Sequence, residues 1–163
     1  MTSPQLLGRD PSDRRFYALD LERVDDWPVR LDVRSPHFVL FVACGAAGLD
    51  VDTISTFAET AMDQGLAYLC ARGPDCERVH DIFDECHVIR SLDLPKDQDK
   101  GVLMTTGHHN DTLEVALDSF FRFAVPNEDF APVCTAWVAA SIGSSEQAGR
   151  MRALLKAWLG QEG

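Results

Sequence analysis

The chain has 163 residues, 45% of them hydrophobic and 25% charged, and its 26 acidic and 15 basic side chains give a formal net charge of −11. These proportions are typical of one compact globular domain and exclude a disordered chain, a collagen-like repeat and a coiled coil. The negative charge disfavours binding to nucleic acids and to anionic membranes, which both depend on Lys and Arg side chains. The sequence has no run of about 18 apolar residues that would predict a membrane span. It also has no apolar segment after Met1 that would predict a secretory signal.

The segment 1–37 carries four prolines among charged residues. We expect it to form an irregular wrap, anchored by Phe16 and Trp27. The rest of the chain, 38–163, is expected to be a single α/β domain.

Four apolar runs in this second part predict strands, and an amphipathic helical pattern follows each of them. The runs are Phe38–Cys44, Leu66–Ala71, Val102–Thr105 and Val133–Ala140. The first and the last are continuously apolar, which is typical of strands that are covered on both faces. A polar connector is expected over Leu92–Gly101.

The predicted helices have start and stop signals at the expected places. In chain order these signals are Asp52 as N-cap with Gly65 as stop, Pro74–Asp75, Asp111 with Glu114, and Ser144 with Gln147. The apolar stripe of the second helix is expected to contain Val79, Ile82, Phe83, Cys86 and Ile89.

Strands that alternate with helices predict a three-layer, Rossmann-like α/β sandwich with a four-stranded, mainly parallel sheet. With the strands numbered along the chain, the expected order is 2-1-3-4, because that order places helices on both faces. Ligands of such sheets bind beyond the carboxyl ends of the strands. The loops that follow the four strands are therefore the candidate site.

Gly45 and Gly48 follow the first strand, where a phosphate-binding loop would lie. Neither GxxxxGK[ST] nor GxGxxG is present, and Asp50 and Asp52 occupy the start of the next helix. The pattern favours a tight turn and a capped helix, and Gly45 and Gly48 stay as candidate ligand-binding residues.

Gly73, Asp75 and Cys76 follow the second strand. If Asp75 is the N-cap, Cys76 lies in the first helical turn, where the helix dipole lowers a thiol pKa, although the neighbouring acids oppose this effect. Cys76 is thus a candidate nucleophile, and a packed cysteine is the alternative interpretation.

The loop after the third strand holds the densest group of polar residues. His108 and His109 are candidate catalytic bases for Cys76, and Thr106, Asn110 and Asp111 are candidate ligand-binding residues. Two imidazoles could also hold a metal ion with Asp75. The alternative is that Asp111 caps the next helix and the histidines bond to neighbouring loops.

Two other groups are weaker candidates. His80, Asp84 and His87 share one face of the second helix, where a surface metal site is possible and a solvated polar face is the simpler interpretation. The five cysteines form no CxxC pair and no zinc-type spacing, which favours a reducing cytoplasm and gives no indication of a cofactor.

Two short motifs carry a resemblance. Arg72-Gly73-Pro74-Asp75-Cys76 and Met104-Thr105-Thr106-Gly107-His108, followed by an amphipathic helix and an apolar strand, resemble a family of small bacterial proteins known only as a domain of unknown function. The resemblance covers residues 38–142 and implies a bacterial, cytoplasmic α/β domain. Members of that family often carry Trp where this chain has Gly107, and the resemblance implies no activity.

Two functions are compatible with these features. The first is a non-catalytic binding module whose acidic surface docks a protein partner or a second copy of the chain, without nucleic acid, membrane or cofactor. The alternative is a small metal-assisted hydrolase or nucleotide-processing enzyme that uses Asp75, Cys76, His108, His109 and Asp111. The missing phosphate loop, triad and zinc spacing favour the first.

Overall fold

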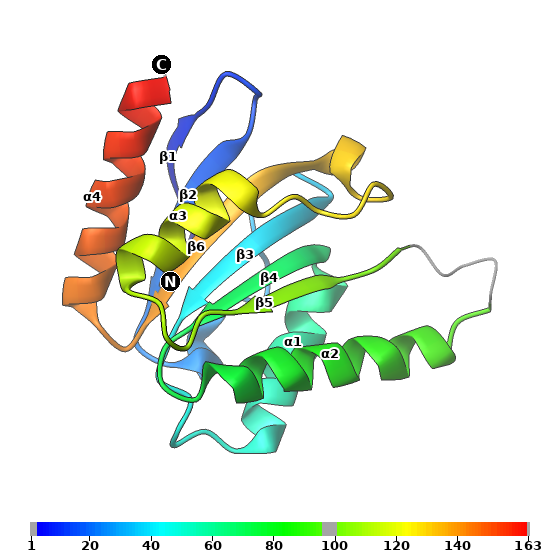
Figure 1. The fold of residues 1–163 in the computed structure, drawn as a ribbon. Coiled ribbons are helices and arrows are strands. Elements are labelled where there is room, and N and C mark those ends of the chain that lie inside the picture. Colours follow the sequence, from blue (N-terminus) through cyan, green and yellow to red (C-terminus); the bar gives the residue numbers. More distant parts are fainter. Residues whose placement is uncertain (1–2, 96–100, 163) are drawn as a thin grey trace.

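A computed structural model describes residues 3–95 and 101–162 of the chain. In it a six-stranded sheet has the order β1-β2-β6-β3-β4-β5 (Figure 1). The strands are β1 (Gln5–Arg9), β2 (Arg15–Leu21), β3 (His37–Ala43), β4 (Leu66–Arg72), β5 (Met104–Gly107) and β6 (Cys134–Ile142). Strand β1 pairs with β2 in the antiparallel sense, and the pairs from β2 to β5 are parallel. The chain therefore has a mixed α/β fold, as expected.

The number and the order of the strands were predicted wrongly. The four expected strands exist as β3, β4, β5 and β6, and they lie in the order β6-β3-β4-β5. With these four strands numbered along the chain, the observed order is 4-1-2-3, whereas 2-1-3-4 was expected. The physical reason is burial: β6 has nine residues, nearly all buried, and lies between β2 and β3. Strand β5 has four residues, none of them buried, and can occupy an edge.

The N-terminal segment also differs from the irregular wrap that we expected, because it forms β1 and β2. Strand β2 is apolar enough to join the interior of the sheet beside β6. Between β2 and β3 lies the short 3-10 helix η1 (Val24–Asp26). Phe16 and Trp27 are buried, as expected of anchors.

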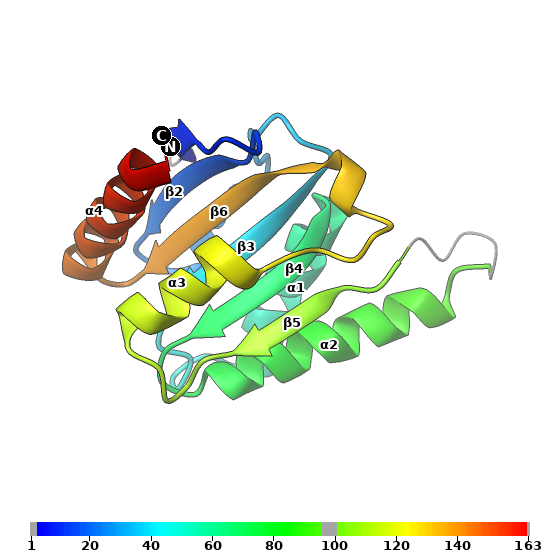
Figure 2. The same ribbon diagram turned by 45° about the horizontal axis from the view of Figure 1, so that its top comes forward.

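Helices cover both faces of the sheet and make three layers (Figure 2). The helices are α1 (Val51–Asp63), α2 (Cys76–Leu92), α3 (Leu113–Phe123) and α4 (Ser145–Glu162), and the 3-10 helix η3 (Ala131–Val133) precedes β6. Helices α1 and α2 pack on one face together with η1, and α3 and α4 pack on the other. None of the described helices has the length and apolar character that a membrane span requires.

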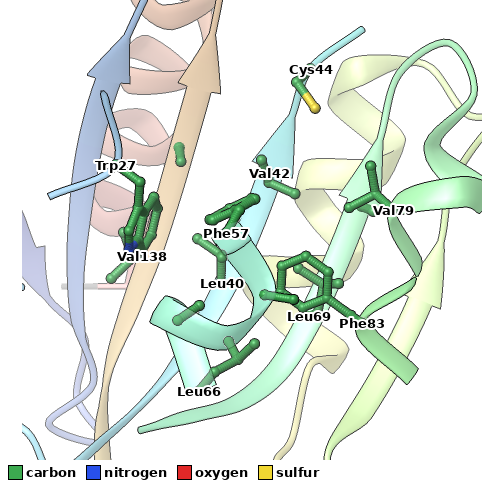
Figure 3. Packing of buried hydrophobic residues seen from close by; sticks show 14 of the residues in the cluster. Trp27, Leu40, Val42, Cys44, Phe57, Leu66, Leu69, Val79, Phe83 and Val138 are labelled. Atoms are coloured by element: carbon green, nitrogen blue, oxygen red, sulfur yellow. The ribbon is translucent and has the colours of Figure 1, made fainter. Parts of the chain in front are cut away.

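Aromatic side chains fill the layer between the sheet and α1 and α2. Phe57 of α1 meets Phe83 of α2 edge to face, with ring centroids 5.2 Å apart, and Trp27 lies 4.9 Å from Phe57 (Figure 3). A fully buried phenylalanine contributes roughly 2–3 kcal/mol to stability. This packing fixes both helices, and with them the loops that lead into them.

The helix starts differ in detail from the expected capping. Asp50, not Asp52, caps α1 and accepts a hydrogen bond of 2.7 Å from the amide of Thr53. Thr112, not Asp111, caps α3. Ser144 accepts from the amide of Gln147 at 3.1 Å, which confirms the expected start of α4.

Helix α2 differs from the expectation near its end. Ile89, assigned to its apolar stripe, is half exposed. Leu92, the first residue of the expected polar connector, is the last residue of α2, and residues 96–100 of the connector lie outside the described residues.

Candidate functional site

The carboxyl ends of β2, β6, β3, β4 and β5 meet at one edge of the sheet, because these strands are parallel. The candidate residues from separate loops therefore do lie along a common edge. The amide of His108 donates to the carbonyl of Ala71 at 2.9 Å, and the amide of Ala46 donates to the carbonyl of Pro74 at 3.0 Å. These bonds join the loops after β3, β4 and β5.

His108 is held by the fold on both sides of its ring. Its Nδ1 lies 2.8 Å from a carboxylate oxygen of Asp111, and its Nε2 lies 3.0 Å from the hydroxyl of Thr106. Only 10% of the side chain is exposed. The imidazole therefore connects the end of β5 to the start of α3, and the same contacts give Thr106 and Asp111 a structural task.

Cys76 begins α2 and is 1% exposed. Burial raises the pKa of its thiol, and the amide of His108, which faces the sulfur, offsets only part of this effect. Asp75 before it has a left-handed backbone and makes no side-chain cap. The neighbouring Cys44 thiol has its pKa raised to about 11, mainly by burial and further by Cys76. Both thiols are protonated at neutral pH.

Gly73 permits the close approach of two loops. Its φ is +126°, and a Cβ atom built there would lie 2.1 Å from the carbonyl oxygen of Cys44. Only glycine fits such a position. The structure thus gives Gly73 a backbone role, next to the candidate ligand-binding role that the sequence suggested.

His109 and Asn110 are exposed. The Nδ1 atom of His109 lies 3.0 Å from a carboxylate oxygen of Glu77, at a shallow hollow of about 290 Å³. The hollow is lined by Glu77, His80, Asp81, Gly107 and His109. No Ser, Thr, Cys or Lys is among these described lining residues, so His109 has no nucleophile beside it to activate.

His80, Asp84 and His87 do not form the solvated face that we expected, because they contact β5 and the residue before it. The Thr105 hydroxyl donates to Asp84 at 2.7 Å and lies 3.0 Å from Nε2 of His80, and the amide of Leu103 donates to His87 at 3.4 Å. Over the described ranges 3–95 and 101–162, no three His, Cys, Asp or Glu side chains are grouped so that they could hold a metal ion.

Gly45 and Gly48 line an open crevice of about 480 Å³. It lies between the ends of β3 and β6, where the chain leaves β3 toward α1 on one face of the sheet and leaves β6 toward α4 on the other. Such a switch point is where parallel α/β sheets bind their ligands. The other lining residues are Glu22, Arg23, Val24, Asp25, Cys44, Leu49, Asp50, Thr53, Ile142 and Gly143.

The rim of the crevice is acidic. Glu22, Asp25 and Asp50 face one cation, Arg23, which pairs with Asp25 at 3.0 Å. Hydrogen bonds from Thr53 hold the pKa of the Asp50 carboxyl below its ordinary value. Asp50 also occupies the N-terminus of α1. The crevice therefore repels phosphate and other anions.

Arg78, which no sequence pattern singled out, holds one wall of the crevice. Its guanidinium donates to the carbonyl oxygens of Ala46 at 3.0 Å and Leu49 at 2.9 Å, and it pairs with Asp75 at 3.3 Å. The guanidinium thus ties the loop after β3 to the start of α2. No local pattern in the sequence indicates contacts between residues this far apart.

A second cavity, of about 380 Å³, lies beside the crevice and shares Glu22 and Gly143 with it. It extends between β2 and the start of α4, where Arg152 pairs with Asp20. The edge is therefore hollowed on both sides of the loop that follows β6.

The sequence model of one protein family, described as "Domain of unknown function (DUF7684)", matches residues 16–158. The chain belongs to the DUF7684 family. The match runs from β2 to the last turns of α4 and confirms the resemblance to a family of unknown function. No curated protein and no solved structure matches this DUF7684 chain.

Proposed function

We propose that the chain is a non-catalytic binding module, Rossmann-like in its switch-point crevice, that acts through a protein partner docked at the carboxyl edge of its sheet. One observation carries this proposal. The crevice at the switch point is open, whereas the two candidate catalytic groups, the Cys76 thiol and the His108 imidazole, are enclosed within the fold and do not line it.

The burial of Cys76 and His108 argues against catalysis at this edge. A nucleophilic cysteine needs a lowered pKa and access to its substrate, and burial gives Cys76 the reverse of both. A general base must reach the proton that it removes, and the His108 ring is only 10% exposed and does not line the crevice. The exposed His109 faces a carboxylate at a hollow without a nucleophile.

The charge of the edge indicates the kind of partner. Glu22, Asp25 and Asp50 surround the crevice of a chain with a net charge of −11, and Val24 and Ile142 supply apolar surface inside it. A protein loop with a lysine or arginine side chain complements both features, because such a side chain has an apolar stem and a cationic head. The five cysteines are free and buried, which supports our further proposal that the protein acts in the bacterial cytoplasm.

A photo-crosslinking amino acid in place of Glu22 tests the proposal in the cells that produce the protein. We expect a covalent adduct with one partner protein. The adduct should be lost when Gly48→Trp fills the crevice. A Cβ atom at Gly48 meets no atom within 4 Å outside its chain neighbours, so the backbone there has room for a side chain.

The matched control carries the same crosslinker in place of Glu128, in the loop that leads to the opposite edge of the sheet, and should give no such adduct. If the purified protein instead retains a stoichiometric divalent metal or a nucleotide that His108→Ala releases, the edge is an enzyme site and the proposal is wrong.

A further inference from the structure

Helix α2 carries a stripe of exposed residues along its outer face. Helical residues three and four positions apart share a face, and Glu77, Asp81, Glu85, Val88 and Leu92 follow that spacing. All five are exposed. We call this set the α2 outer stripe.

The rotation of α2 is fixed by contacts on its two flanks. On one flank the guanidinium of Arg90 pairs with Glu59 at 2.6 Å and Asp63 at 2.8 Å, both on α1. On the other flank the hydroxyl of Thr105 on β5 donates to Asp84 at 2.7 Å. Because both flanks are bonded, the α2 outer stripe is held away from the sheet.

The stripe is divided along its length. Its first half is acidic, with Glu77, Asp81 and Glu85. Its second half is aliphatic: Val88 is 55% and Leu92 is 79% exposed. Ile89, beside the stripe, is 52% exposed and extends the apolar half. Three exposed aliphatic side chains in two helical turns are typical of an interaction surface.

We propose that the α2 outer stripe docks an amphipathic helix of a partner protein, whose aliphatic residues cover Val88 and Leu92 and whose lysine or arginine residues face the three acids. Aliphatic residues four positions apart are the usual anchors of helix-to-helix docking. No residue of the α2 outer stripe lines the crevice, so this inference does not rest on the function proposed above.

Charge argues against a second copy of the chain as the occupant. If two copies met through parallel α2 helices, the acidic halves would face each other. If the helices were antiparallel, the carboxylates of each would face the aliphatic residues of the other. Both arrangements are unfavourable, because they bury carboxylates without a cationic partner.

Synthetic helical peptides added to the full-length protein test this proposal. The stripe is about 24 Å long, so a peptide of about 18 residues spans it. One peptide has leucines four positions apart in its first half and lysines at the same spacing in its second half. A second has the halves in reverse order, and a third has glutamates in place of the lysines.

We expect one of the two lysine peptides to shift amide NMR signals of α2, while the glutamate peptide shifts none. Leu92→Ser and Asp81→Lys should each weaken binding about fivefold or more. The control variants Val29→Ser and Glu146→Lys, exposed residues outside α2, should bind as the wild type does. Affinity should fall as salt rises from about 50 to about 500 mM, because surface ion pairs are screened.

Several results would overturn the proposal: no signal shift with either lysine peptide at about 1 mM, shifts centred outside α2, or equal weakening in the control variants. Sedimentation of the free protein tests whether the occupant is a second copy of the chain. A dimer that Leu92→Asp dissociates would assign the α2 outer stripe to a second copy instead.

Discussion

The guanidinium of Arg78, on α2, donates a hydrogen bond of 2.9 Å to the carbonyl oxygen of Leu49, in the loop between β3 and α1. A second bond reaches the carbonyl of Ala46 at 3.0 Å. The wall of the crevice is thus attached to a helix that is itself packed on the sheet. The shape of the crevice depends on a side chain that does not line it.

Replacing Arg78 should therefore loosen the crevice. We expect Arg78→Ala to lower the free energy of unfolding by about 1–3 kcal/mol, because two carbonyls lose a charged donor. Arg78→Lys should restore only part of this, since an ammonium lacks the fork that reaches both oxygens. Urea denaturation measures the loss, and amide exchange should rise at residues 46–49. Arg30→Ala, at an exposed residue, is the control. Full stability of Arg78→Lys would contradict the expectation.

Glycines at the same edge should differ sharply in their response to alanine. A Cβ atom at Gly73 would lie 2.1 Å from the carbonyl oxygen of Cys44, at a φ of +126°, whereas one at Gly48 meets no atom within 4 Å. We expect Gly73→Ala to cost about 2 kcal/mol or more and Gly48→Ala to cost less than about 0.5 kcal/mol. Thermal unfolding of the two variants compares them directly. Equal melting temperatures would show that the two loops do not approach as closely as described.

The strands and helices of residues 38–163 could be predicted from the sequence because their signals are local. Apolar runs and helical stripes depend on neighbouring residues, and most of them mark real elements. Strand order does not follow from local signals, since the central place of β6 depends on pairing with β2 and β3, both distant in sequence. Strand β2 was missed because prolines and charges nearby outweighed its short apolar pattern.

The candidate site could likewise be predicted only where it depends on local signals. The sequence indicated which loops share an edge, because parallel strands place their carboxyl ends together. It could not indicate that His108 would be enclosed by Thr106 and Asp111, or that Arg78 would bridge two loops. Those outcomes depend on side-chain contacts that only the packed structure defines.

The buried thiols should make the protein less stable at alkaline pH. An ordinary thiol has a pKa of 9.0; burial raises the pKa of Cys44 to about 11 and those of Cys70 and Cys134 to about 12. Above pH 9 the thiols of the unfolded chain lose protons that those of the folded chain keep. The contribution of these thiols to the free energy of unfolding is therefore fully present below this pH and is lost as the pH rises. We expect a loss of about 1 kcal/mol per thiol by about pH 10.

Urea unfolding between about pH 8 and about pH 10 measures this loss. Measurements stop there because burial also raises the pKa of Tyr17 and Tyr68, which add the same trend at higher pH. Cys134→Ala removes one of the thiols and should reduce the slope. A flat stability profile over this range would mean that the thiols are accessible to solvent.

The two neighbouring histidines should behave in opposite ways. His108→Ala breaks contacts with Thr106 and Asp111 in a nearly enclosed site, and we expect it to lower the free energy of unfolding by about 1–2 kcal/mol. His109→Ala removes a half-exposed ring that faces Glu77 and should change stability by less than about 0.5 kcal/mol. Chemical denaturation of both variants gives the comparison.

Below its melting temperature His108→Ala should still form the crosslink from position 22, because His108 supports the edge without lining the crevice. A His108→Ala variant that folds as stably as the wild type but no longer forms this crosslink would instead indicate that His108 acts at the crevice itself.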